Sequence, residues 1–231
     1  MGSVSGTELF ENEITGVLEK YPKLSVDSAN GKIILKGDIE LIDEHSVHRD
    51  TYSIEIHPVA AFPFRFPYVF ETGGKLPWNV DWHVFENDGH CCIKVEPEEI
   101  LICKNGITLL NFIEQQVLPY LFNQTFRRTN GYYINERAHG LLGIINFYRE
   151  QFKEKNVQRL IMLMEFVLNN GEPNRVSKCF CGTGNKYRKC HKDAYRMLHD
   201  IGVETVSIHL VLIKGLISKV IESNKKEDTL G

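Results

Sequence analysis

The stretch HRDTYSIEIHPVAAFPFRFPYVF, residues 48–70, decides the fold of this chain. Its first half alternates apolar with polar side chains, the period of a strand that buries one face: Tyr52, Ser53, Ile54, Glu55 and Ile56. Its aromatic second half carries prolines, which suit an edge strand or a strand end. With the apolar run 32–36, which follows the turn pair Asn30-Gly31, it predicts three consecutive strands in an antiparallel meander.

Helical periodicity surrounds this meander. Residues 7–20 repeat apolar side chains at helical spacing before Tyr21-Pro22 ends the pattern, and four further stripes follow the meander, near 110–121, 141–152, 160–168 and 203–223. Residues 71–106 are predicted to be mostly irregular, and a loop of that length in a compact domain is usually functional. The fold class predicted is therefore α+β, with a helical extension after the break at Asn169–Pro173 and a polar, loose tail.

Composition narrows the function classes. The chain has 231 residues, of which 42% are hydrophobic and 25% charged, with a net charge of -3. These values are ordinary for a globular protein and point to neither nucleic acid nor a membrane surface as a direct partner. We find neither a long uncharged apolar run nor a signal peptide, so a reducing cytoplasm is expected. In that compartment the six cysteines are free thiols or metal ligands.

Three of the cysteines lie close together in the stretch CFCGTGNKYRKCH, residues 179–191. Its thiolates and imidazole have metal-site spacing, and a Cys₃His set is common for structural Zn²⁺: Cys179, Cys181, Cys190 and His191. Gly182 and Gly184 permit a tight turn about the ion, and the surrounding basic residues favour thiolates. Four protein ligands leave no open position, which predicts a structural rather than a catalytic site.

This segment, about residues 177–192, resembles the SEC-C motif, a small zinc module found at the ends of many bacterial proteins. The motif reads approximately Cys-Pro-Cys-Gly-Ser-Gly, Lys-Lys-Tyr-Lys-Lys-Cys, then Cys or His. Here Phe180 stands where the motif has proline. The module either staples the C-terminal helices together or docks a partner, and the sequence leaves both roles open.

The second group is Asp88-Gly89-His90-Cys91-Cys92-Ile93. A thiol that follows a glycine turn near imidazoles can be a reactive thiolate. A lone cysteine is more often a small buried hydrophobe, which is our expectation for Cys91 and Cys103.

The element order, a helix, a meander, an aromatic Pro-containing segment, a loop with a cysteine after glycine and then helices, resembles the ubiquitin-conjugating (UBC-like) fold. The resemblance covers roughly residues 5–125 and extends to 153. Phe62–Pro67 is similar to the family's Pro-Phe-x-Tyr-Pro segment, and Gly89–Ile93 to its Gly-x-x-Cys-Leu site, which puts Cys92 at the thioester position. The family's His-Pro-Asn would begin at His83, but Pro-Asn is missing. The predicted domains are therefore 1–153, UBC-like, and 154–231, helical with the zinc motif.

The narrower pattern of Gly-Gly-Lys-x-Pro, Asp-Trp-His, Cys-Cys-Ile and Pro-Glu-Glu-Ile is similar to stand-alone bacterial conjugating-enzyme homologues of antiphage (CBASS) operons, which lie beside a cGAS-like nucleotidyltransferase. This resemblance implies a transferase that forms a Cys92 thioester with the C-terminus of that synthase, or with a ubiquitin-like tail. It would then promote attachment to a target lysine and prime antiviral defence.

The residues that would support this chemistry are predicted from proximity. His83 and His90 would raise the thiolate fraction of Cys92, and Asn87 or loop N–H groups would stabilise the oxyanion. Nearby acidic residues would orient an incoming lysine or take its proton: Asp88, Glu96, Glu98 and Glu99.

Two alternatives remain beside the conjugating enzyme. One is a catalytically inactive UBC-like scaffold that only binds the partner, as the missing Asn would allow. The other is a papain-like cysteine hydrolase with His139 as the base, which the sequence disfavours because no strong helix is evident after Cys92. The aromatic stripe of Phe64, Phe66 and Tyr68 is expected in the core.

Overall fold

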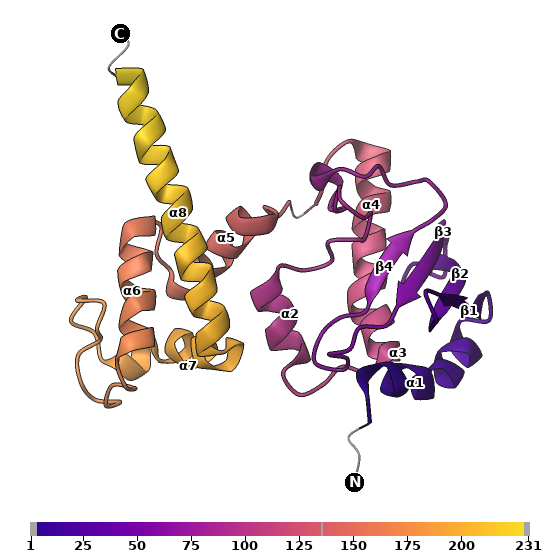
Figure 1. Ribbon diagram of the computed structural model, residues 1–231, viewed down its shortest axis with the longest axis horizontal. Coiled ribbons are helices and arrows are strands. Elements are labelled where there is room, and N and C mark those ends of the chain that lie inside the picture. The colour runs from indigo at the N-terminus through magenta and orange to yellow at the C-terminus, as the bar shows by residue number, and fades with distance from the viewer. Residues whose placement is uncertain (1–3, 135, 229–231) are drawn as a thin grey trace. The chain divides into compact units, whose positions relative to one another are not determined.

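A computed structural model describes residues 4–134 and 136–228 of the chain (Figure 1). The chain divides into two compact units, Met1–His139 and Gly140–Gly231. Both helices and an antiparallel sheet are present, so the predicted α+β class is confirmed.

The first unit is built on a sheet that has four strands among the described residues, in the order β1-β2-β3-β4 and antiparallel throughout. These strands follow the helix α1 (Gly6–Lys20) and are β1 (Leu24–Ala29), β2 (Lys32–Ile42), β3 (His48–His57) and β4 (Tyr68–Glu71). The predicted helix at 7–20 is therefore confirmed. It begins with a side-chain cap, because the Ser5 hydroxyl accepts a hydrogen bond from the amide of Glu8.

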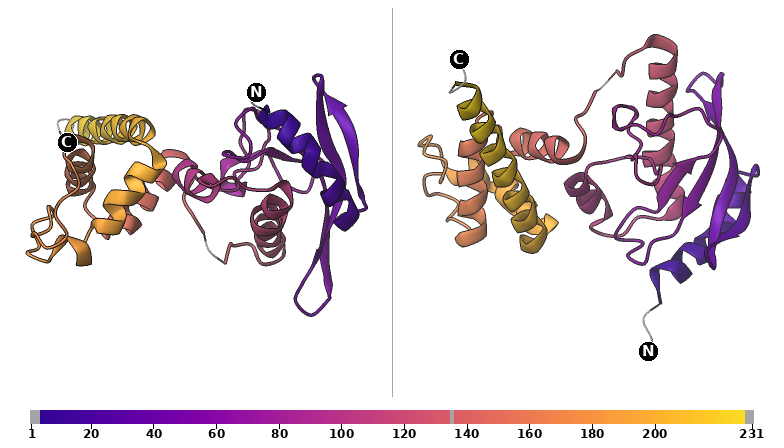
Figure 2. Two further views of the ribbon diagram at one scale, coloured as in Figure 1. Left: turned by 90° about the horizontal axis from the view of Figure 1, so that it is seen from below. Right: turned by 45° about the horizontal axis from the view of Figure 1, so that its top comes forward.

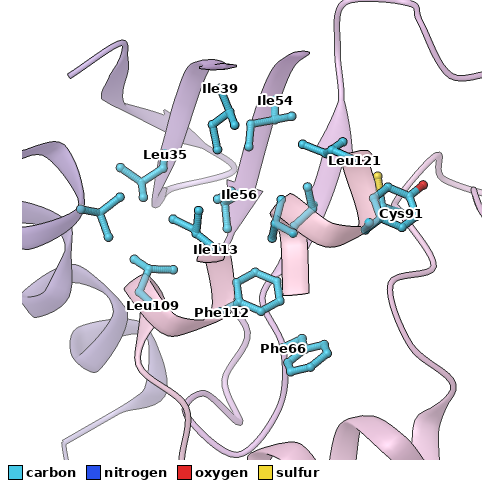
Figure 3. Packing of buried hydrophobic residues seen from close by; sticks show 14 of the residues in the cluster. Leu35, Ile39, Ile54, Ile56, Phe66, Cys91, Leu109, Phe112, Ile113 and Leu121 are labelled. Atoms are coloured by element: carbon cyan, nitrogen blue, oxygen red, sulfur yellow. The ribbon is translucent and has the colours of Figure 1, made fainter. Parts of the chain in front are cut away.

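The sheet has one apolar and one polar face. On the buried face Leu35 pairs with Ile56 and Ile39 with Tyr52, and all four are fully buried. Figure 3 shows Leu35, Ile39 and Ile56 in this core. On the other face Lys36 pairs with Glu55 and forms an ion pair at 3.0 Å. The alternation read from residues 52–56 therefore sets the orientation of the strand.

Helices cover the apolar face. After the short η1 (Val80–Trp82) come α2 (Glu96–Cys103), α3 (Leu109–Phe112), the π-helical η2 (Ile113–Val117) and α4 (Leu118–Asn130). Figure 2 shows α1 and α4 on the same side of the sheet, and their apolar side chains share one core with it. Of the predicted stripe Leu110, Ile113, Val117 and Leu121, the last three are fully buried there and Leu110 is partly buried.

Two strand predictions were wrong. The sheet has an additional strand, β1, whose burial pattern shows only its first residue buried, so it carries no clear alternation. It is joined to β2 by the turn Asn30-Gly31, where both residues have positive φ. The aromatic run contributes only Tyr68–Glu71 to the sheet, and the preceding Phe62–Phe66 forms turns.

The expected aromatic stripe is also mostly not in the core. Phe66 is buried, but Phe64 and Tyr68 are 59% and 50% exposed. With the strand beginning only at Tyr68, the period of two that predicted the stripe does not apply to the turn residues before it.

The loop 71–106 was predicted to be mostly irregular, and α2 corrects this over Glu96–Cys103. The helix is marked by Pro97 in its first turn and by acidic residues at its N-terminus, both of which favour a helix start. Its eight residues give too short a stripe for helical periodicity to stand out.

The second unit is helical: α5 (Gly140–Phe152), α6 (Val157–Asn169), η3 (Tyr187–Lys189), α7 (Lys192–Ile201) and α8 (Val203–Asp228). Its core includes Tyr148, Phe152 and Leu160, with α5, α6 and α8 in mutual contact. The hydroxyl of Tyr148 and Nδ1 of the buried His209 lie 2.8 Å apart and join α5 to α8. The predicted end of a helix at Asn169 is confirmed. The break at Asn169–Pro173, which the sequence favours as a domain boundary, lies inside this unit.

Two boundaries differ from those expected. The units divide at His139, earlier than the predicted 153, because α5 packs with α6 and α8. The tail predicted to be loose continues α8 to Asp228, and residues 229–231 lie outside the described part. Among the described residues no single helix is long and apolar enough to cross a membrane, although α7 with Val203–Val220, bent by 101°, passes on length and composition.

Candidate metal centre and thiol site

The predicted metal ligands come together in the second unit. The Sγ atoms of Cys179, Cys181 and Cys190 and a ring nitrogen of His191 all lie within 4.8 Å of one another. The Cys181 and Cys190 sulfurs are 3.6 Å apart, and Nδ1 of His191 is 3.3 Å from the sulfurs of Cys179 and Cys190. Thiolates bonded to a tetrahedral zinc at about 2.3 Å would be about 3.8 Å apart. These four residues, called the knuckle below, can hold a metal ion.

The backbone turns that shape the knuckle use glycine. Gly182 and Gly184 both have φ of +79°, the left-handed region that glycine adopts without strain. The amide of Cys179 donates to the carbonyl of Asn185 (2.8 Å), which closes the loop between the first two cysteines and the last ligands. The guanidinium of Arg159 donates to the carbonyl of Cys181 (2.7 Å) and fixes this loop to α6.

His191 is oriented as a metal ligand. Its Nε2 lies 2.8 Å from the carbonyl oxygen of Phe152, which can only accept, so Nε2 carries the proton. Nδ1 then has a free electron pair directed at the thiols. A histidine whose second nitrogen donates to a backbone carbonyl is the usual arrangement around bound zinc.

The knuckle also favours at least one thiolate without metal. Burial opposes ionisation of Cys181, but hydrogen bonds from Thr183 and the neighbouring thiols outweigh it and lower the pKa to about 6. Burial raises the pKa of Cys190 to about 11. A bound cation would deprotonate both thiols outright.

Phe180, the departure from the motif, has a packing role. Its ring stacks on Phe166 of α6 with centroids 4.4 Å apart and planes within 7°. It also contacts His191, at 5.6 Å between ring centroids. An aromatic side chain at this position therefore attaches the knuckle to α6.

The cysteine pair of the first unit is divided by the backbone. The Cys91 amide donates to the carbonyl of Val69, and the Cys92 amide donates to the carbonyl of His83, both at 2.7 Å. Neighbouring side chains in such an extended segment point to opposite sides. Cys91 is consequently 5% exposed and joins the core (Figure 3), whereas Cys92 is half-buried. Cys103 is fully buried, so the expectations for Cys91 and Cys103 are confirmed.

Gly89 makes the preceding turn. Its φ is +81°, and a Cβ atom there would lie 2.3 Å from the indole ring of Trp78. No other residue type fits this turn without displacing the ring. The glycine turn predicted from the sequence is therefore present.

Cys92 opens onto two cavities. One, of about 800 Å³, is lined by residues of α4 and of the segment after it, together with His83 and Cys92. The other, of about 500 Å³, lies beside α2 and includes Arg65, Glu96 and Glu99. The thiol therefore borders two cavities, and the second one contains both carboxylates and cationic side chains.

Two histidines surround the thiol. Ligand atoms of His83, Cys92 and His139 lie within 4.8 Å of one another. The imidazole rings of His83 and His139 meet edge to face, with centroids 3.9 Å apart. His139 reaches the site because the chain after α4 folds back, where the Tyr133 hydroxyl donates to Gln124 at 3.0 Å.

The electrostatics keep this site neutral. Burial, and then the Glu99 carboxylate, raise the pKa of Cys92 to about 11. Burial, with contributions from His139 and Arg127, lowers the pKa of His83 to about 3. Burial also lowers the pKa of His139. The prediction that His83 supplies positive charge to a Cys92 thiolate is therefore not supported, because the imidazole is uncharged at neutral pH.

The other predicted groups lie around the thiol rather than against it. Nδ1 of His90 is 2.6 Å from Asp88, and its ring stacks on Phe85, with centroids 4.1 Å apart. Asn87 is exposed and outside the lining of both cavities, so its oxyanion role stays a prediction.

The acidic residues of α2 are already engaged. Glu99 accepts from Nε of Arg65 (2.6 Å) and Glu96 from Nη1 of the same guanidinium (3.2 Å). Glu98 pairs with Arg137. A lysine entering the second cavity would compete with Arg65 for these carboxylates.

Comparisons with protein-family models, with curated proteins and with solved structures gave no match. The SEC-C and UBC-like resemblances therefore stay predictions that rest on this chain's own residues. The sequence suggests His139 only as the base of a hydrolase, and no local pattern predicts that it lies beside Cys92.

Proposed function

We propose that this chain is a ubiquitin-conjugating-like transferase that carries an acyl group as a thioester on Cys92. The observation that carries the proposal is the contrast among the three thiols of the first unit. Cys91 and Cys103 are buried in the core, whereas Cys92 is half-buried and lines both cavities. An acyl group has to reach sulfur through open space. Cys91 also borders the second cavity but is only 5% exposed, so of these three thiols Cys92 is the most accessible.

The proposed donor is the C-terminal carboxyl group of a cGAS-like nucleotidyltransferase, or of a ubiquitin-like protein, delivered as a thioester. The Cys92 thiolate attacks the carbonyl carbon, a new C–S bond forms, and the donor thiol leaves. A lysine amine of the target then attacks, an amide forms and the Cys92 sulfur leaves, which primes antiphage signalling. The choice of donor rests on the sequence resemblance.

The raised pKa of Cys92 limits when this can happen. Burial raises the pKa of the Cys92 thiol and lowers the pKa of the His83 imidazole, so proton transfer from this thiol to this imidazole is unfavourable. Burial also lowers the pKa of His139, and Asp81 and Glu136 partly offset that effect. Cys92 is accordingly at rest until a donor or a cation enters the site.

The test is co-expression with the genomic neighbours, followed by a non-reducing gel. We expect a thiol-sensitive adduct that is lost in Cys92→Ser and kept in Cys91→Ser and Cys103→Ser, with circular dichroism to confirm that the buried-site controls fold. Cys92→Lys should trap the acyl group as a stable amide. Full biological activity of Cys92→Ser would refute the proposal and favour the inactive scaffold.

A cysteine hydrolase is the second candidate function. Two observations favour it more than the sequence did: His139 lies against Cys92, and α2 begins at Glu96, shortly after the thiol. A hydrolase would release the donor as a free carboxylic acid and require His139. The hydrolase would be favoured by two results together: the parent protein releases the free acid without accumulating an adduct, and His139→Gln does not release it.

For the knuckle we propose structural Zn²⁺. Its support is the convergence of three sulfurs and the free Nδ1 of His191 on one point, with every ligand supplied by the protein. Metal analysis should find zinc that is lost in Cys181→Ser and retained in Lys189→Gln, a neighbouring substitution that leaves the ligands intact. Equal zinc content in both variants would contradict the assignment.

A further inference from the structure

We propose that His83, Cys92 and His139 form a second metal site, which binds a borderline-soft divalent cation such as Zn²⁺ in the first unit. Two imidazole nitrogens and one sulfur are the ligand types that zinc takes. Their atoms lie within 4.8 Å of one another, the same limit that the knuckle ligands meet.

The three ligands come from segments that other contacts already hold in place. The His83 carbonyl accepts hydrogen bonds from the Cys92 amide (2.7 Å) and from the Tyr120 hydroxyl (2.9 Å). The neighbouring Trp82 carbonyl accepts from the Gln124 side chain (2.8 Å). These bonds tie the loop of His83 to the extended segment of Cys92 and to α4, so two of the ligands are positioned before any ion binds.

His83 is held in a conformation that histidine rarely adopts. Its φ of 52° and ψ of 41° lie in the left-handed region, which is sterically unfavourable for a residue with a side chain. Such strain is concentrated at functional sites. Here the conformation presents the imidazole edge to His139 beside Cys92.

His139 provides the second, independent observation. Its Nδ1 is shielded from solvent and has no hydrogen-bond partner among the described residues. A buried polar atom without a partner destabilises the folded state. An ion bound through Nδ1 would satisfy this atom.

The proposed site differs from the knuckle in being open. Three protein ligands leave a fourth position for water or a substrate atom, as in catalytic zinc sites. His83 and Cys92 line the cavity of about 800 Å³, so this position has room for a ligand. Binding would release the Cys92 proton to solvent and occupy the sulfur. If Cys92 carries an acyl group as proposed above, the metal-bound and acylated forms of Cys92 exclude each other.

The binding itself is tested on the full chain with Co²⁺ as a spectroscopic probe for Zn²⁺. We expect two kinds of binding event with sulfur-to-cobalt absorption. One should be lost in Cys181→Ser, and the other should weaken more than about a hundredfold in Cys92→Ser and in His139→Gln, beyond the range seen when only outer partners are removed. His90→Gln, a histidine of the same loop paired with Asp88, should keep both events.

A second measurement does not depend on stoichiometry. Zn²⁺ should protect Cys92 from iodoacetamide in the parent protein, as followed by peptide mass spectrometry, and should not protect it in His139→Gln. A single cobalt event that vanishes in Cys181→Ser, or protection that persists in His139→Gln, would overturn the proposal. Thioester formation is measured separately in chelator-containing buffer. Absence of metal binding would therefore leave the acyl-carrier proposal intact, and absence of the thioester would leave the metal-site proposal intact.

Discussion

The reactivity of Cys92 should increase at a higher pH than that of an ordinary cysteine thiol. Its pKa is raised from 9.0 to about 11, first by burial and then by the Glu99 carboxylate. Because only the thiolate reacts, two units correspond to about a hundredfold less thiolate at neutral pH than an unperturbed thiol would have. The rate of alkylation should therefore keep increasing up to about pH 11, because a raised pKa moves formation of the thiolate to higher pH.

The perturbation that tests this cause is Glu99→Gln, which removes the charge and keeps the shape. It should move the midpoint of the pH–rate profile for Cys92 to lower pH, while burial keeps that midpoint above the value of a free thiol. Glu98→Gln is the matched control, because Glu98 pairs with Lys94 and Arg137 and is not among the groups that shift Cys92.

The assay is pulsed iodoacetamide labelling in chelator-containing buffer, with the Cys92 peptide quantified by mass spectrometry at each pH. Maximal labelling already at pH 8 would refute the assignment of a resting, protonated thiol. A profile that shifts equally in both variants would refute the role of Glu99.

Three other changes should alter the stability of the fold. Gly89→Ala should lower the free energy of unfolding by at least about 1–2 kcal/mol, from the left-handed backbone and the collision with an indole ring, as measured by urea unfolding. Its control, Gly16→Ala on an open helix face, should stabilise by up to about 1 kcal/mol. Phe180→Leu should cost the second unit about 0.5–1.5 kcal/mol for the lost stack on Phe166, and an unchanged unfolding midpoint would contradict that role. Chelation should lower the unfolding temperature of the parent protein far more than that of Cys181→Ser, and equal shifts would contradict a structural metal.

The sequence predicted those features that depend on neighbours along the chain. Alternation in residues 52–56 identified β3 and its buried face, and the spacing of four ligands identified the knuckle. The glycine before the cysteine pair marked a turn that only glycine fits. In each case the physical constraint acts within a few residues, so it leaves a readable pattern.

The features that were missed depend on contacts between distant segments. β1 has an exposed pattern and is fixed mainly by pairing with β2. His139 comes to Cys92 because the segment after α4 folds back onto the site, and no local pattern encodes that path. The charge of His83 has the same origin, since burial by remote residues, rather than loop sequence, lowers the pKa of its imidazole.

The neutral state of the thiol site explains how one cysteine can serve the proposed chemistry without reacting indiscriminately. With the Cys92 pKa near 11 and two uncharged imidazoles beside it, the free protein holds neither a thiolate nor a fixed positive charge in the cavity. Two kinds of molecule that enter can then change this state: a donor that brings its own positive charge lowers the pKa of the thiol, and a cation displaces the thiol proton but binds the sulfur. Both routes act on the same sulfur and in opposite directions, because a cation occupies the electron pair that an acyl group needs. Labelling of Cys92 with and without Zn²⁺, in the presence of the donor, therefore separates the two routes directly.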